Sequence, residues 1–136
     1  MVLQKANAPL VRAPNTHALI RRRLALLTAI MQGGRRLLVS RRLLREYGEH
    51  VLVPRNDTIR AFFEIVTRGD RVVWNWPKWG GAEREVMGRC RFPREDEHVL
   101  RTAVRGTEST VFTEENRMLR TSACVHRRLR VRITAP

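Results

Sequence analysis

The sequence predicts an α+β fold, and three patterns within its 136 residues support that class. Residues 57–68 carry apolar side chains at three- and four-residue spacing and are followed by Gly69, which is typical of an amphipathic helix. Residues 71–76 are rich in valine and tryptophan, which favours a strand. Residues 128–133 alternate between arginine and apolar side chains, the pattern of a strand with one buried face. A chain of this length is expected to form one domain of roughly 100 residues plus an extension.

The first 35 residues are predicted to form a basic N-terminal extension with an amphipathic helix over 16–31. The apolar stripe of this helix consists of Ile20, Leu24, Leu27 and Met31. An arginine-rich, acid-free amphipathic N-terminus is also typical of a mitochondrial targeting segment, although the serines that such segments favour are missing. The alternative is an ordinary helix that docks on a neighbouring element.

The middle of the chain contains four further elements. Residues 37–44 fit either a strand or a helix, because a short apolar run does not distinguish the two. Residues 83–92 show an extended pattern, and residues 98–104 fit a strand or a short helix. Residues 113–116 could cap or close a short helix, which the family resemblance described below places within 107–116.

The positive charge is concentrated at the two ends of the chain. There are 27 basic and 13 acidic residues, which gives a net charge of +14. Residues 1–45 and 117–136 contain no acidic side chain, whereas residues 46–116 are nearly neutral. Nucleic acid is the commonest polyanion that neutralises such a protein, and arginine binds phosphate through a planar fork. The alternative is a solvated basic surface without a partner.

The expected order of elements is strand, helix, strand, strand, short helix, strand, which resembles a ferredoxin-like split βαβ sandwich (βαββαβ). Three segments resemble the bacterial-type small-subunit ribosomal protein six family. A helix closes in glycine and continues into a strand over 67–73. A Trp-Gly pair precedes a basic residue and an apolar run over 79–86, with the next strand at 98–100. An asparagine precedes an apolar-arginine-threonine step within 116–121.

The resemblance covers residues 36–128 and implies a ferredoxin-like RNA-binding domain in a structural protein of the small ribosomal subunit. Such a protein contacts ribosomal RNA and pairs with small-subunit ribosomal protein eighteen. Residues 1–35 and the basic C-terminal strand or tail, 129–136, would be extensions of a mitochondrial form located in the matrix. Two alternatives remain open: an accessory subunit of a mitochondrial membrane (respiratory) complex, and a large-subunit mitoribosomal protein.

The candidate RNA contacts are arginines. They are Arg35, Arg36, Arg41, Arg42, Arg84, Arg120, Arg127, Arg128, Arg130 and Arg132. The three arginines of the alternating strand at 128–133 would lie on one face about 6.6 Å apart, close to the spacing of phosphates along a strand. Trp74, Trp76 and Trp79 could stack on unpaired bases, or pack in the core or against a partner protein.

No enzyme chemistry is expected. The four histidines lack metal-ligand spacing, and the carboxylates at 83–85 and 95–97 are expected to balance nearby arginines. Cys90 and Cys124 are too few for a disulfide scaffold, so reduced thiols in a reducing compartment are expected. We therefore expect no metal, no cofactor and no small-molecule substrate. The longest apolar run, residues 24–31, is too short for membrane insertion.

Overall fold

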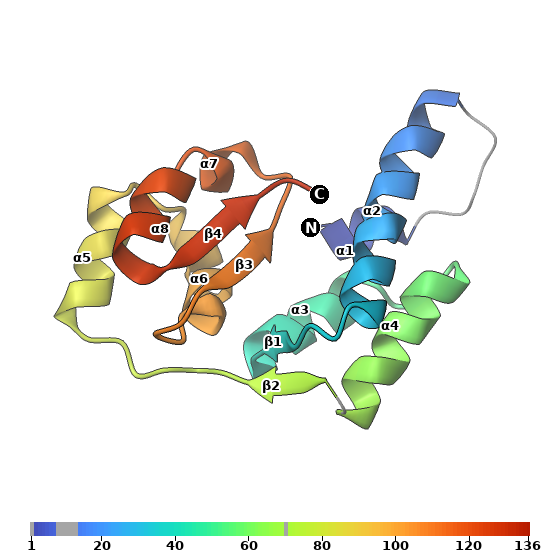
Figure 1. The fold of residues 1–136 in the computed structure, drawn as a ribbon, viewed down its shortest axis with the longest axis horizontal. Helices are drawn as coiled ribbons and strands as arrows, with labels where there is room; N and C mark the ends of the chain where they lie inside the picture. The colour runs from blue at the N-terminus through green and yellow to red at the C-terminus, as the bar shows by residue number, and fades with distance from the viewer. Residues whose placement is uncertain (1, 8–13, 70) are drawn as a thin grey trace.

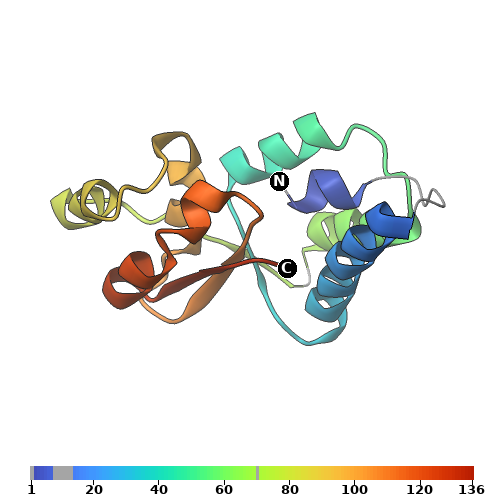
Figure 2. The same ribbon diagram turned by 90° about the horizontal axis from the view of Figure 1, so that it is seen from above.

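The protein is described from a computed structural model, which covers residues 2–7, 14–69 and 71–136. Helices and strands are mixed along the chain, so the predicted α+β class is confirmed. The elements gather into two lobes that lie side by side (Figures 1 and 2). The first lobe contains α1 (Val2–Ala6), α2 (Pro14–Gln32), β1 (Leu37–Val39), α3 (Arg41–His50), α4 (Asp57–Arg68) and β2 (Val72–Trp74). The second lobe contains α5 (Gly81–Arg89), a 3₁₀ turn η1 (Arg94–Asp96), α6 (Glu97–Ala103), β3 (Ser109–Phe112), α7 (Asn116–Leu119), α8 (Ser122–Leu129) and β4 (Val131–Thr134).

Each lobe contains its own two-stranded parallel sheet. In the first lobe β1 pairs with β2, and Leu37 lies opposite Val72. In the second lobe β3 pairs with β4, and Ser109 lies opposite Val131. A ferredoxin-like sandwich would instead place four strands in one sheet. The described residues therefore correct the expected sheet arrangement, although not the α+β class.

Two segments adopt the opposite secondary structure to the one predicted. Residues 83–92 were expected to be extended, but α5 occupies residues 81–89 because its buried side chains, Val86, Met87 and Cys90, follow helical spacing. Residues 107–116 were expected to contain a short helix. Residues 109–112 form β3 instead, because the Ser-Thr-Val-Phe segment suits a strand and pairs with β4 along its whole length. The cap expected at 113–116 is confirmed, since Glu115 is the N-cap of the short helix α7.

The structure assigns the two segments, 37–44 and 98–104, that could be either strand or helix. Residues 37–44 are both a strand and a helix, since Ser40 ends β1 and its hydroxyl accepts a hydrogen bond from the Leu43 amide (3.2 Å) as the N-cap of α3. Residues 98–100, a strand under the family resemblance, lie inside helix α6.

The helices with clear local signals are confirmed. The prediction for 57–68 matches α4, where the Asn56 side chain accepts from the Ile59 amide (3.0 Å) and Gly69 closes the helix with φ 76°. The helix expected at 16–31 is α2, which spans residues 14–32.

Only part of the segment 128–133, in which arginine and apolar residues alternate, forms a strand. Helix α8 continues to Leu129, and Arg130 ends it in the left-handed region with φ 56°. β4 begins at Val131, where Val131 and Ile133 are buried and Arg132 faces solvent. The predicted row of three strand arginines is therefore wrong, because Arg128 belongs to a helix and only Arg132 lies in the strand.

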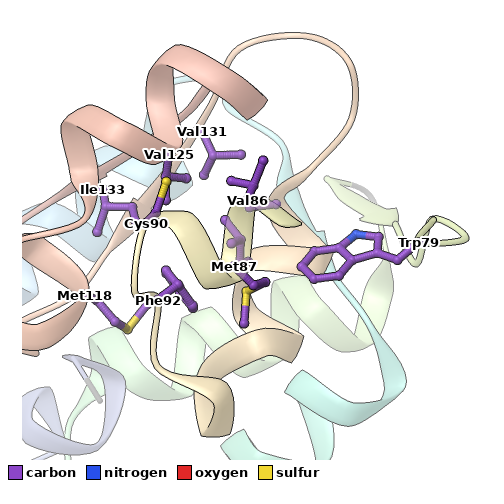
Figure 3. Close-up of a cluster of buried hydrophobic side chains, with 11 residues drawn as sticks. Trp79, Val86, Met87, Cys90, Phe92, Met118, Val125, Val131 and Ile133 are labelled. Carbon is purple, nitrogen blue, oxygen red and sulfur yellow. The ribbon is translucent and has the colours of Figure 1, made fainter. Parts of the chain in front are cut away.

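Each lobe also has its own apolar core. In the first lobe Ile59 and Phe62 of α4 pack with Leu27 of α2 and with Leu3 of α1, so the N-terminal helices contribute to this core. The larger core of the second lobe is shown in Figure 3. It contains Trp79, Val86, Met87, Cys90, Phe92, Leu100, Ala103, Met118, Val125, Val131 and Ile133.

A disulfide between Cys90 and Cys124 links the end of α5 to α8 across 34 residues of sequence. This corrects the expectation that both cysteines are free thiols. The two cysteines are far apart in sequence, and only the packing of α5 against α8 brings them together.

Polar contacts join the two lobes. The Thr102 hydroxyl of α6 donates to the Ser40 hydroxyl (2.8 Å), and both groups are buried. The Asn75 side chain donates to the Thr102 carbonyl (2.8 Å). Glu114 accepts from Arg23 of α2 through both carboxylate oxygens (2.6 and 3.0 Å), and from Lys5 of α1 (2.9 Å). These contacts connect α1, α2 and α3 to the second lobe.

We predict that reducing the disulfide lowers the free energy of unfolding by about 3 to 4 kcal/mol, because the link closes a loop of this size in the unfolded chain. Urea unfolding with and without dithiothreitol measures the effect. In the double variant C90A/C124A, the reductant should leave the urea midpoint unchanged. An equal loss in that variant would assign the effect to something other than the disulfide.

We predict that the Glu114 contacts make folding sensitive to acid. The hydrogen bond from Arg23, helped by Lys5, lowers the pKa of Glu114 from 4.5 to about 2. Its stabilising effect is therefore complete above pH 4.5 and is lost as the pH falls towards 2. Glu114→Gln should lower the thermal midpoint at pH 7, and the difference from wild type should shrink towards pH 2. Glu64→Gln, at an exposed site on α4, is the control. Parallel pH curves for Glu114→Gln and wild type would contradict this.

Candidate nucleic-acid interface

All ten arginines proposed as RNA contacts are exposed. Among the residues that the structure describes, only Arg132 of the ten forms an ion pair, with Glu108 at 2.8 Å. A guanidinium without an acidic partner remains available to phosphate. The ten do not form one row, since they lie in separate groups on both lobes.

The largest group lies at the end of α8 and in β4. Arg127 and Arg128 are in the last turn of α8, where the helix dipole stabilises positive charge. Arg130 ends the helix and Arg132 projects from the following strand. Arg120 lies in the turn before α8 and is also exposed. The helix end thus holds several free cations close together along the chain.

A second group begins α3. Arg41 and Arg42 occupy the first turn of this helix, which contains no acidic residue. The unpaired amides of a helix N-terminus favour anions, and two exposed guanidinium groups add to this preference. Two exposed guanidinium groups thus lie at this helix start, where the Leu43 amide is already bonded to the Ser40 hydroxyl (3.2 Å).

Arg84 lies on α5 and lines a shallow groove of about 710 Å³. Three further arginines line the same groove: Arg91, Arg94 and Arg117. Arg117 pairs with Glu95 at 2.6 Å, while Arg91 adopts a left-handed backbone with φ 53°. The sequence does not indicate that these three arginines surround Arg84, because an extended segment over 83–92 would not bring them together.

Arg35 and Arg36 lie elsewhere, at a cleft of about 550 Å³ between the lobes. The cleft is lined by β1, β3 and parts of α2 and α6, and Arg105 joins the two predicted arginines there. Both predicted residues are exposed in the link between α2 and β1.

The three tryptophans separate into two environments. Trp79 is buried in the second core, so it packs inside the molecule and offers no face to a base or a partner. Trp74 and Trp76 are 63% and 46% exposed. β2 ends at Trp74, so the two do not share one strand, yet both reach the surface. The Arg101 guanidinium lies over the Trp76 ring at 4.2 Å, which leaves the other ring face for stacking.

The structure also reveals an acidic junction that the sequence analysis did not identify. It consists of Glu46 on α3, Asp96 at the start of α6, and Glu115 before α7. Burial raises the pKa of Asp96, and the charges of Glu95, Glu46 and Glu115 raise it further. Buried His98 contacts the Glu46 carboxylate through Nε2, while its Nδ1 lies 3.1 Å from the Glu95 carbonyl. Because these residues come from distant segments, no local pattern predicts the junction.

Within residues 2–7, 14–69 and 71–136, no group of three or more His, Cys, Asp or Glu side chains could hold a metal ion. In the same ranges, none of the helices has the length and apolar character required to span a bilayer.

In comparisons with known proteins, no family model matches this chain, and neither a curated protein nor a solved structure matches it.

Proposed function

We propose that the protein binds RNA through its exposed arginines and acts by positioning rather than by catalysis. The observation that carries this proposal is the net charge of +14 together with ten exposed arginines, only one of which is ion-paired among the described residues. Phosphate contacts of this kind supply most of the affinity in protein–nucleic acid binding. Exposed Trp74 and Trp76 add surfaces for base stacking.

The specific form of the proposal is a structural protein of the mitochondrial small ribosomal subunit, located in the matrix beside small-subunit ribosomal protein eighteen. Of the three segments that resemble small-subunit ribosomal protein six, residues 67–73 keep the helix, glycine and strand that the resemblance implies and support this form. The segments at 79–100 and 116–121 are helical and do not support it. The two separate parallel sheets do not support a ferredoxin-like arrangement. The proposal therefore rests mainly on the positive charge.

Two other assemblies are distinguished by simple measurements. An accessory subunit of a mitochondrial membrane complex would stay bound to its complex after nuclease treatment, whereas an RNA-bound protein would be released. A large-subunit protein would sediment with the large ribosomal subunit instead of the small one.

We predict that the end of α8 contributes phosphate contacts. The double variant R127Q/R128Q should weaken binding to a 20-nucleotide RNA. It should also make the slope of log K against log salt shallower by about 1.4, the value for two lost phosphate contacts on a single strand. Fluorescence anisotropy from 50 to 200 mM salt measures both quantities.

The matched control is R60Q/R89Q, which removes the same charge from arginines that already pair with Asp57 (3.0 Å) and Glu85 (2.5 Å). This control should keep the wild-type slope. Equal slopes for the two double variants would show that only net charge matters and that α8 is not a contact.

The acidic junction favours a second candidate function, an enzyme that cleaves the bound polyanion. A partly buried carboxyl whose pKa is raised by neighbouring charges is a feature of catalytic sites. For Asp96, burial is the main cause of the raised pKa, and the charge of the adjacent Glu95 raises the pKa further, while His98 opposes the shift. Glu46 and Glu115, from other elements, add smaller contributions.

Asp96→Asn tests this candidate. Since folding raises the pKa of Asp96, its ionised form destabilises the folded state at neutral pH, and this cost disappears below its unfolded pKa. The variant should therefore be more stable than wild type at pH 7 and equal to it near pH 3. If the junction is catalytic, wild type should cleave end-labelled RNA and D96N should not. No cleavage by wild type, in magnesium or in EDTA, would exclude the second candidate.

A further inference from the structure

The cleft between the lobes is bordered by two unpaired strand edges. β1 and β3 both line it, and among the described residues each pairs with a neighbouring strand on one side only. Helix α6 packs against both strands and forms part of the same cleft. The two sheets therefore present their free edges to one shared space.

The hydrogen bonds of each sheet show which backbone groups face the cleft. Ser109 donates to the Arg130 carbonyl (3.1 Å), and Thr113 donates to the Thr134 carbonyl (2.9 Å). In a parallel pair, every second residue directs its amide and carbonyl to the partner strand, and the residues between them direct theirs away. The amides and carbonyls of Thr110 and Phe112 therefore point away from β4, towards the free edge of β3. The same reasoning applies to Leu38, because its neighbours Leu37 and Val39 bond to the β2 side.

Part of the cleft wall is apolar, and charged and polar side chains line the rest. Half-buried side chains from four elements line it: Leu26, Ile30, Leu38, Val99, Val111 and Phe112. An apolar space bordered by unpaired amides and carbonyls suits an extended peptide, whose backbone repeats donors and acceptors at the strand spacing and whose side chains fill the walls.

The charged residues at the cleft indicate which charge the two ends of such a peptide would have. Arg35, Arg36 and Arg105 line it and are exposed. Its acidic residue, Glu108, already pairs with Arg132 (2.8 Å). The surplus is positive, so acidic residues on both sides of an apolar segment complement it.

We propose that this cleft binds an extended apolar segment of a partner protein, flanked by acidic residues, which adds as a strand to the free edge of β3. The partner strand would bury the half-exposed apolar walls and satisfy the amides and carbonyls of Thr110 and Phe112. This proposal depends on the strand edges and not on RNA binding, so either can fail without the other.

The probe is the synthetic decapeptide Asp-Glu-Val-Ile-Val-Thr-Val-Ile-Asp-Glu, carrying a fluorophore and titrated with the full chain. Two control peptides replace the four acidic residues by lysine or the two central residues by proline. The acidic peptide should bind more tightly than either control by about tenfold or more, the loss expected when a backbone hydrogen bond or a charge contact is removed. Hydrogen exchange should slow at the amides of Thr110 and Phe112 when the peptide is bound.

Thr110→Pro is the decisive variant, because it removes an edge amide that does not bond to β4. It should weaken peptide binding about tenfold, while RNA affinity stays unchanged. If the variant is unstable in urea, R35Q/R36Q/R105Q replaces it and should abolish the preference for acidic over lysine-ended peptide.

The proposal is overturned by equal binding of the three peptides or by exchange protection away from β3. It is also overturned if a ten-nucleotide oligouridine protects the same amides in place of the peptide. Dimerisation of the chain that is lost in Thr110→Pro would overturn it too, because a second copy would then occupy the edge.

Discussion

Helix α6 holds the two lobes in one arrangement. On one side its Thr102 hydroxyl bonds to Ser40, which is also the N-cap of α3, and its Thr102 carbonyl accepts from Asn75 after β2. On the other side it packs against β3 within the second lobe. Ser40 and Thr102 are both buried, and each hydroxyl has a second partner: Ser40 accepts from the Leu43 amide (3.2 Å), and Thr102 donates to the His98 carbonyl (2.7 Å). The positions of the cleft, the acidic junction and the arginine groups relative to one another all follow from this contact.

This arrangement separates the two kinds of charge. The acidic residues are used largely within the structure, as in the contacts of Glu114 with Arg23 and Lys5. Most of the predicted arginines have no such partner among the described residues and remain at the surface. The excess positive charge of the chain is therefore available for a polyanion, while the internal pairs hold the lobes together.

The parts that could be predicted from the sequence are those fixed by neighbouring residues. Helix α4 has a capping Asn56 at one end and Gly69 at the other, and both signals act locally. The exposure of the arginines also follows from the residue type alone. β3 could not be predicted, because its strand form depends on pairing with β4 about twenty residues later. Likewise, the acidic junction joins Glu46 to Asp96, and only the docking of α3 on α6 brings these residues together.

The disulfide also affects the order in which the two lobes unfold. Both of its cysteines lie in the second lobe, so that lobe is covalently closed, whereas the first lobe is held only by packing and polar contacts. Opening of the first lobe breaks no covalent bond and leaves the cross-linked core intact. We therefore expect hydrogen exchange and proteolysis to reach the first lobe before the cross-linked core of the second.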